Sequence, residues 1–242
     1  AWSIPGSLTS YVYFARPDSK FKGRVVESAR QAGLTDRVVV ATPDQEIVDA
    51  CRRFDAEAVL TSPVHPTGTD RIAEVATLLA SDVYVNVQGD EPLVQPEDIK
   101  ACAQPLLDDA SIKMGSVFAE CPDDEIDNPA VVKVVTDLLG DALYFSRCAV
   151  PFARKARTES VKKHIGLYAY TAEALKGFAD WPQTPLEKAE SLEQLRFLEH
   201  GVKIRMSRGR GSALAVDTPE QADAVRTILL QQKERPRPPK SS

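Results

Sequence analysis

The stretch DVYVNVQ, residues 82–88, decides the fold because it reads as a central strand that carries polar groups on one side. Its three valines share one face, while Tyr84, Asn86 and Gln88 share the other, since side chains alternate along a strand. A central strand of a parallel sheet is normally apolar on both faces. The amides of Asn86 and Gln88 must therefore be hydrogen-bonded within the fold or used by a ligand.

Carboxylates follow two of the predicted strands. Asp90 and Glu91 come after Gly89, which allows the chain to turn at the carboxyl end of the strand, where open α/β sheets bind ligands. Asp217 lies at another strand-to-helix junction, where a helix N-terminus alone would also favour a negative charge. Carboxylates from two strand ends are suited to hold Mg²⁺, which prefers oxygen ligands. An ordinary polar turn is the alternative for Asp90 and Glu91, and stabilisation of a helix N-terminus is the alternative for Asp217.

Short β-branched runs alternate with helix-like segments through the first half of the chain. The runs VYFAR, RVVVAT and EAVLT occupy residues 12–16, 37–42 and 57–61. This alternation is typical of βαβ units and predicts a mainly parallel sheet flanked by helices. The second half differs, because VVKVVTD and ALYFSR, at residues 131–137 and 142–147, are too close for a crossover and predict a hairpin in a small β-rich lobe.

Helix boundaries are also marked. Thr42, with Pro43 and Gln45 after it, has the pattern of a cap, a first-turn proline and a capping box, and the same pattern begins at Thr218. We expect one long helix from Leu186 to His200. Beyond the last helix, residues 231–242 contain no core residue and are rich in proline and charge, so a disordered tail is expected.

Composition excludes some classes of function. The chain has 242 residues, 43% of them hydrophobic, which suits a single α/β domain with a packed core. A net charge of −5 argues against general nucleic-acid binding. No apolar run approaches the roughly 20 residues of a membrane span. Four widely spaced cysteines without a C-x-x-C pair favour a reducing compartment, so we expect a cytoplasmic protein.

Other polar residues become candidates only in combination. Thr67, Gly68 and Thr69 precede a predicted helix whose first turn contains Arg71, so backbone amides and hydroxyls converge at a helix start. No P-loop or dinucleotide-binding glycine motif occurs. In the predicted strand HIGLYAY, residues 164–170, His164 and Tyr168 share a face with a bare glycine between them, which leaves room for a ligand. Each of these features alone is also consistent with an ordinary structural role.

Seven motifs, in order, resemble the 3-deoxy-manno-octulosonate cytidylyltransferases, or CMP-Kdo synthetases. In chain order they are TGTDRIAE, NVQGDEP, NPAVVKVV, ALYFSR, HIGLYAY, TPLEKAESLEQLRFLEHG and VDTPE. The resemblance as a whole extends from about residue 25 to residue 229. The resemblance implies a Rossmann-like nucleotide-diphospho-sugar transferase fold in one domain, residues 1–230. It also implies a homodimer that requires Mg²⁺ and transfers the CMP group of CTP to Kdo, releasing pyrophosphate, in lipopolysaccharide precursor synthesis.

The resemblance assigns roles to particular residues. Asp90 and Asp217 would be the catalytic carboxylates that hold Mg²⁺. The residues that would bind CTP are Arg16, Lys20, Thr67, Gly68, Arg71 and Gln88. The residues that would bind the sugar acid are Arg147, His164, Tyr168, Glu193 and Gln194. A 2-keto sugar acid requires a cation for its carboxylate and several hydrogen-bonding groups for its hydroxyls, which this set contains.

The chain departs from the family at its start, residues 1–24. Family members have a loop resembling A-R-Y-x-S-x-R-[FL]-P-G-K-P-L, followed by a G-K-P-M segment, and their basic residues hold the triphosphate. Here the sequence is YVYFARPDSKFKGRVVESAR, residues 11–30, and about ten residues of the pattern are absent. Two alternatives stay open: a cytidylyltransferase for another sugar acid and, because of this start, a non-catalytic binding or dimer-forming protein that has lost its phosphate loop.

Overall fold

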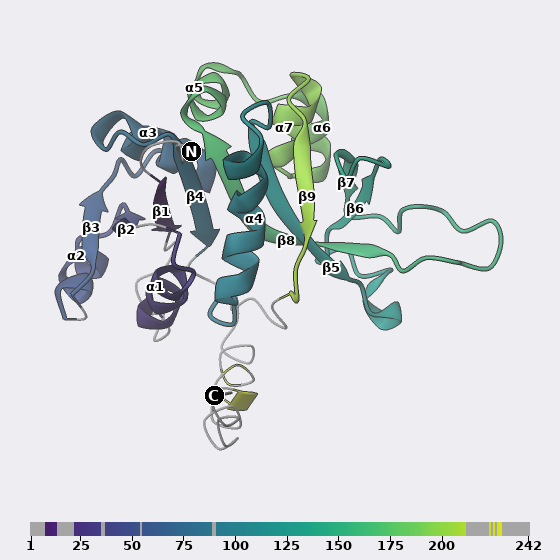
Figure 1. Cartoon of the computed structure of the whole chain (residues 1–242), viewed down its shortest axis with the longest axis horizontal. Coiled ribbons are helices and arrows are strands. Elements are labelled where there is room, and N and C mark those ends of the chain that lie inside the picture. Colours follow the sequence, from purple (N-terminus) through teal and green to yellow (C-terminus); the bar gives the residue numbers. More distant parts are fainter. Residues whose placement is uncertain are drawn as a thin grey trace.

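The computed structural model describes residues 8–13, 22–34, 37–53, 55–88, 91–211, 223, 225, 227 and 228. Within these residues the chain forms a nine-stranded sheet with helices on both faces (Figure 1). The strands are β1 (Leu8–Tyr13), β2 (Arg37–Thr42), β3 (Glu57–Leu60), β4 (Val83–Gln88), β5 (Met114–Glu120), β6 (Lys133–Thr136), β7 (Ala142–Ser146), β8 (Lys162–Thr171) and β9 (Ile204–Arg208).

The main sheet has the strand order β3-β2-β1-β4-β8-β5-β9. Strands β1 to β4 are mutually parallel, β9 is parallel to β5, and β8 runs against both of its neighbours in this path. The predicted α/β class with a mainly parallel sheet is confirmed. The carboxyl ends of β1 to β4 therefore lie at one edge of the sheet, together with the beginning of β8.

Two apolar cores cover the two faces of the sheet. Helices α1 (Lys22–Gln31), α2 (Gln45–Arg52) and α4 (Pro96–Asp108) share one core with the valine face of β4. Helices α3 (Gly68–Leu78), α5 (Ala172–Asp180), α6 (Pro185–Glu190) and α7 (Gln194–Glu199) cover the face that contains Tyr84. The alternation predicted along β4 is thus confirmed, and its polar side faces the second layer of helices.

The β-rich lobe is confirmed as a hairpin. Strands β6 and β7 pair antiparallel, and β6 joins the sheet through β8 (Figure 1). The loop between β7 and β8 extends away from the sheet, and residues 151–160 are exposed along their whole length. A short 3-10 helix, Asp123–Glu125, lies between β5 and β6. The lobe thus adds antiparallel strands beside β8 without interrupting the parallel half.

Two predicted helix boundaries are wrong. The cap of α2 is Asp44, whose carboxylate accepts a hydrogen bond from the Glu46 amide at 2.8 Å. Thr42 is the last residue of β2 and accepts from the Asp44 amide instead. The long helix expected from residue 186 to residue 200 is two short helices, because Ser191 adopts a left-handed conformation with φ of 53° and ends α6.

The first strand begins earlier than predicted, at Leu8, and ends at Tyr13. The predicted segment beyond residue 13 lies outside the described residues, as do Thr218 and residues 231–242. Of the last predicted helix, Val225 is fully buried, as its apolar pattern indicated. No helix among the described residues is long and apolar enough to cross a membrane.

Candidate active site

A row of polar side chains crosses the middle of the sheet on the face covered by α3, α5, α6 and α7. Tyr168 of β8 lies opposite Asn86 of β4 on one side and opposite Ser116 of β5 on the other. Directly paired residues project to the same face of a sheet, so the three side chains form one row. All three are buried. This row lies where the sequence predicted polar groups that a ligand would use.

His164 is held beside this row. Its Nε2 lies 3.0 Å from the Ser116 hydroxyl, and its ring packs edge-on against Phe145 at 4.9 Å and near Tyr168 at 5.4 Å between ring centroids. Burial lowers the pKa of His164 to about 3, because the charged imidazolium loses its hydration. The imidazole is therefore neutral at physiological pH and offers one donor and one acceptor.

Tyr168 extends the row toward the helices. Its hydroxyl donates to Gln194 Oε1 at 3.3 Å, and burial holds the pKa of the Tyr168 phenol well above its usual range. Gln194 Nε2 and both polar atoms of Asn86 are buried and form no hydrogen bond with the residues the structure describes. A buried polar atom without a partner costs about 1–3 kcal/mol. These orphaned amide atoms thus favour a polar ligand in this layer.

Glu193 connects α7 to the start of α3. Its carboxylate accepts from the Thr69 hydroxyl at 2.8 Å and from the Thr69 amide at 3.4 Å, and Thr69 in turn lies 3.0 Å from the Tyr170 hydroxyl. Burial raises the pKa of Glu193, and the nearby Asp70 acts in the same direction, while the threonine hydrogen bonds oppose both. The predicted sugar-acid residue Glu193 and the predicted CTP loop are therefore joined directly.

The helix start at Thr67 has the predicted form. Thr67 caps α3 by accepting from the Asp70 amide at 3.2 Å, and Gly68 is the first helical residue. Arg71 is buried and donates through Nη1 to the Thr61 hydroxyl at 2.5 Å and to the Ser62 carbonyl at 2.8 Å. Arg71 thus fixes the loop that leads into α3 in addition to any part it has in binding phosphate.

Gln88 occupies the space predicted for a ligand next to Gly166. A methyl group at Gly166 would lie 3.2 Å from Gln88 Cδ and 3.3 Å from its amide atoms. The expectation of an open gap between His164 and Tyr168 is therefore wrong, because the side chain of the neighbouring strand fills it. The glycine instead allows the Gln88 amide, a predicted CTP contact, to lie flat on β8.

Arg147 links three segments of the chain, mainly through hydrogen bonds to backbone carbonyls. Its Nε donates to the Glu190 carbonyl at 2.8 Å, Nη1 to the Pro129 carbonyl at 3.0 Å, and Nη2 to the Ser191 carbonyl at 3.5 Å. The Glu190 carboxylate accepts from the Arg147 amide at 2.9 Å and from the Ser146 hydroxyl at 2.7 Å. Burial alone would raise the pKa of Glu190, but these hydrogen bonds outweigh it and lower the pKa. Two donor hydrogens of the guanidinium stay available for a ligand.

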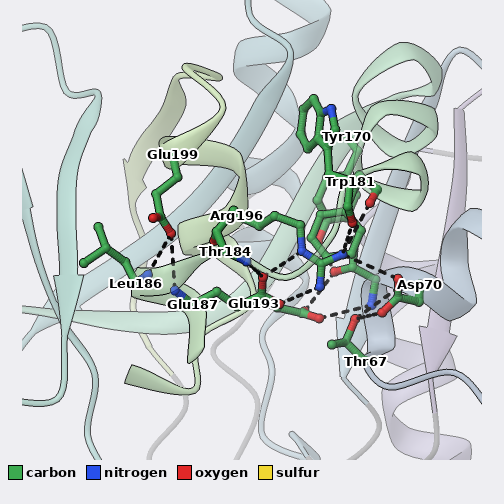
Figure 2. Close-up of polar contacts among 12 residues, drawn as sticks. Thr67, Asp70, Tyr170, Trp181, Thr184, Leu186, Glu187, Glu193, Arg196 and Glu199 are labelled. Carbon is green, nitrogen blue, oxygen red and sulfur yellow. Dashed lines mark hydrogen bonds and ion pairs between the residues drawn. The ribbon is translucent and has the colours of Figure 1, made fainter. Parts of the chain in front are cut away.

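A buried ion pair holds α6 and α7 in place (Figure 2). Arg196 donates through Nε to Glu187 Oε2 at 2.8 Å and through Nη2 to Glu187 Oε1 at 2.5 Å. Its Nη1 donates to the carbonyls of Phe178 and Trp181, each at 3.3 Å, and lies 3.8 Å from Asp70. This network links α3, α5, α6 and α7, and it therefore positions Glu193 and Gln194.

Four predicted site residues lie outside the described residues: Asp90, Asp217, Arg16 and Lys20. Among the residues that are described, no group of three His, Cys, Asp or Glu side chains is placed to hold a metal ion. The carboxylate pair expected to hold Mg²⁺ therefore stays a prediction.

The sequence did not single out Ser116, Lys133, Glu187 or Glu190. Ser116 had a usable signal, since it is a polar residue within the apolar strand MGSVFAE. Lys133 had a weaker signal, as a single lysine among the valines of VVKVV. In the structure its ammonium is fully buried and donates to the carbonyls of residues 128, 131 and 147. Glu187 and Glu190 have the spacing of ordinary surface helix residues, so the burial of Glu187 and the hydrogen bonds of the half-buried Glu190 depend on contacts that sequence alone does not give.

The fold and the polar row define a class, and comparison with known proteins establishes it. The family model described as Cytidylyltransferase matches residues 22–204, so the chain belongs to the cytidylyltransferase family. It is 45% identical over 207 residues to the 3-deoxy-manno-octulosonate cytidylyltransferase of Koribacter versatilis, covering 85% of this chain and 79% of the relative. Identity with the enzyme of the same name from Chlorobium limicola is 47% over 212 residues, with coverage of 85% and 86%.

A solved structure gives the same result. The structure of CMP:2-keto-3-deoxy-manno-octonic acid synthetase complexed with CTP superposes with a TM-score of 0.88 at 34% identity, covering 93% of this chain and all of that one. A 4-diphosphocytidyl-2C-methyl-D-erythritol synthase from Anaerococcus prevotii, at 14% identity and a TM-score of 0.61, shares the fold alone. The resemblance to the CMP-Kdo synthetases and the nucleotide-diphospho-sugar transferase type of fold are confirmed.

Proposed function

We propose that this protein transfers the CMP group of CTP to the sugar acid Kdo, giving CMP-Kdo and pyrophosphate. The observation that carries the proposal is the buried polar row, with orphaned amide atoms at Asn86 and Gln194, in a chain 45–47% identical to relatives named for this reaction. The row offers neutral donors and acceptors in a layer sheltered from water, which suits a polyhydroxylated sugar.

In the proposed reaction, the anomeric hydroxyl oxygen of Kdo forms a bond to the α-phosphorus of CTP. The bond from that phosphorus to the oxygen bridging to the β-phosphate breaks, pyrophosphate leaves, and the hydroxyl proton is released. Little covalent chemistry is required of the protein, so its contribution is positioning and charge neutralisation. Tyr168, Gln194 and His164 would orient the sugar hydroxyls, and Gln88 with the start of α3 would bind the nucleotide.

We also propose that the reaction depends on Mg²⁺, bound by Asp90 and Asp217. Gln88 is the last residue of β4, so Asp90 follows the carboxyl end of a central strand, and carboxylate oxygens are the ligands that Mg²⁺ prefers. The ion would neutralise charge on the triphosphate. Glu91 is the matched control, because it is the other acidic residue at this turn.

The test is pyrophosphate release with CTP, Kdo and Mg²⁺. We expect turnover in the unmodified chain, a loss of at least about 100-fold in Asp90→Asn, and little change in Glu91→Gln. Turnover with another sugar acid but not with Kdo would mean that the protein is a cytidylyltransferase for that other acid. Tight binding of Kdo with no pyrophosphate release would favour the non-catalytic alternative.

The homodimer and the cytoplasmic location are proposals as well. Exposed apolar side chains support a dimer: Leu138 and Leu139 lie at the turn of the β6–β7 hairpin, and Leu143 lies on β7. Light scattering should give twice the mass of the 26.5 kDa chain, and Leu143→Asp should yield monomer. Leu78→Asp, at an exposed apolar position on α3, is the control, and an unmodified chain that is monomeric would reject the dimer.

A further inference from the structure

Ser116 lies where the ladder between β5 and β8 is interrupted. Ser116 is paired with Tyr168, but the next residue, Val117, is paired with Ile165, so Gly166 and Leu167 are extra residues on β8. The Ser116 hydroxyl donates to the Leu167 carbonyl at 2.8 Å. The serine side chain thus supplies a hydrogen bond at the bulge, where the regular pattern between the strands is lost.

The hydrogen bond to Leu167 determines whether the Ser116 hydroxyl donates to His164 or accepts from it. A serine hydroxyl has one hydrogen, and a carbonyl oxygen can only accept, so that hydrogen is committed to Leu167. The Ser116 oxygen then faces His164 Nε2 at 3.0 Å as an acceptor. Nε2 must therefore carry the imidazole hydrogen, and Nδ1 is left with a bare lone pair in the neutral ring.

Nδ1 of His164 forms no hydrogen bond with another residue in the described part of the chain. Because a bare imidazole nitrogen accepts and a carboxylate oxygen also accepts, the two repel, whereas a hydroxyl group can donate to Nδ1. The ring is held by its edge-on contact with Phe145 and by its Nε2 contact with the Ser116 hydroxyl, while the His164 backbone amide donates to the Val132 carbonyl at 2.8 Å. It can therefore discriminate between these two kinds of ligand group.

We propose that Ser116 is a positioning residue that holds His164 with its hydrogen on Nε2, so that Nδ1 accepts a hydrogen bond from a hydroxyl of the sugar acid. The sugar-binding part rests on the proposed function, whereas the position of the hydrogen does not. In this arrangement Ser116 affects sugar affinity without contacting the sugar.

The first test is nitrogen-15 NMR of the imidazoles in the unmodified protein at neutral pH. The chain has 3 histidines, so His164 can be assigned by its loss in His164→Gln. We expect a protonated Nε2 and an unprotonated Nδ1. A hydrogen on Nδ1 in the unmodified protein would overturn the proposal whether or not any Ser116 variant folds.

The second test compares Ser116→Ala with Ser116→Thr, which restores a hydroxyl, and with Ser207→Ala, a serine of the adjacent strand β9. In Ser116→Ala we expect the hydrogen to redistribute between the two nitrogens and the KM for Kdo to rise about tenfold, the loss of one hydrogen bond. The values of kcat and of the KM for CTP should change less than about twofold. Ser116→Thr and Ser207→Ala should behave as the unmodified protein.

An unchanged imidazole pattern and an unchanged KM for Kdo in folded Ser116→Ala would reject the role of Ser116. If the unmodified chain shows the expected pattern but releases no pyrophosphate and does not bind Kdo, the proposed function and the sugar contact fail together. The assignment of the hydrogen by Ser116 then stands on the NMR result alone.

Discussion

The side chain with the largest expected effect on stability is Glu187. It is buried and forms two hydrogen bonds to the guanidinium of Arg196, which also lies over the Phe178 ring at 3.8 Å. Glu187→Gln would leave that guanidinium buried without its carboxylate, so the free energy of unfolding should fall by about 3–5 kcal/mol. Urea denaturation followed by circular dichroism measures this change.

Glu173→Gln is the matched control. Glu173 pairs with Lys113 at 2.9 Å, but the two side chains are 77% and 43% exposed. Ion pairs exposed to water contribute about 0–1 kcal/mol, so this variant should unfold at nearly the same urea concentration as the unmodified chain. Equal effects of the two substitutions would mean that the Glu187 pair does not hold the helices together.

At the scale of elements, the break between α6 and α7 is decided by Ser191. Its φ of 53° strains a residue with a side chain, and a β-branched residue there is strained most. Ser191→Val should lower the free energy of unfolding by about 1–2 kcal/mol, while Ser191→Gly should not lower it. Thermal unfolding of the two variants side by side checks this, and a stable Ser191→Val would mean that the two helices can join.

A second element-scale prediction concerns the segment before β6. The Lys133 ammonium donates to the carbonyls of Asn128 and Val131, and also to that of Arg147 at the end of β7. Lys133→Met leaves three carbonyls without a donor, so amide exchange in residues 128–131 should become about 30-fold faster, a loss of about 2 kcal/mol. Hydrogen exchange read by mass spectrometry measures it, and Lys113→Met, at an exposed lysine, should leave that segment unchanged.

The elements also show how far sequence can predict this fold. Period-2 alternation identified β4 and its two faces, and close spacing identified the β6–β7 hairpin, because both signals are local. The long helix was predicted wrongly because SLEQLRFLEH keeps a helical period through Ser191, and the left-handed conformation of Ser191 that separates the two short helices has no signature in this pattern. Thr42 failed as a cap because Asp44, two residues later, binds the Glu46 amide.

At the scale of the whole molecule, stability should depend on pH through His164. Its pKa in the folded chain is about 3, below the usual 6.5, so between these values the unfolded chain binds a proton that the folded chain does not. Stability therefore falls as pH falls through this window, by about 1.4 kcal/mol per pH unit. Glu193 acts in the opposite direction, since its pKa is raised and protonation favours the folded chain.

The contribution of His164 can be isolated with His164→Gln, because all other groups cancel in the comparison. From pH 6 to pH 4, the unmodified chain should lose about 2.5 kcal/mol more free energy of unfolding than the variant does. Urea titrations at several pH values test this. Parallel stability curves for the two proteins would mean that His164 titrates equally in the folded and unfolded chains.

Sequence predicted those residues of the candidate site that lie within recognisable motifs. Residues of the sugar set were named from the sequence, and the structure brings His164, Tyr168 and Gln194 together across β8 and α7. Ser116 was not predicted, because its importance depends on a two-residue bulge in a strand about 50 positions away. The brace made by Arg147 was also not predictable, since its partners are backbone carbonyls, which have no sequence signature.

Strand β8 has a consequence for synthesis of the chain. The open side of β4 finds its partner only in residues 167–171 of β8, about 80 residues later in the chain. At roughly 5–20 residues per second on the ribosome, β4 would wait several seconds with unpaired backbone groups, a state that favours aggregation. Nascent chains that stop before Lys162 therefore need a chaperone more than complete ones do, and slow codons between β4 and β8 should reduce the yield of folded protein.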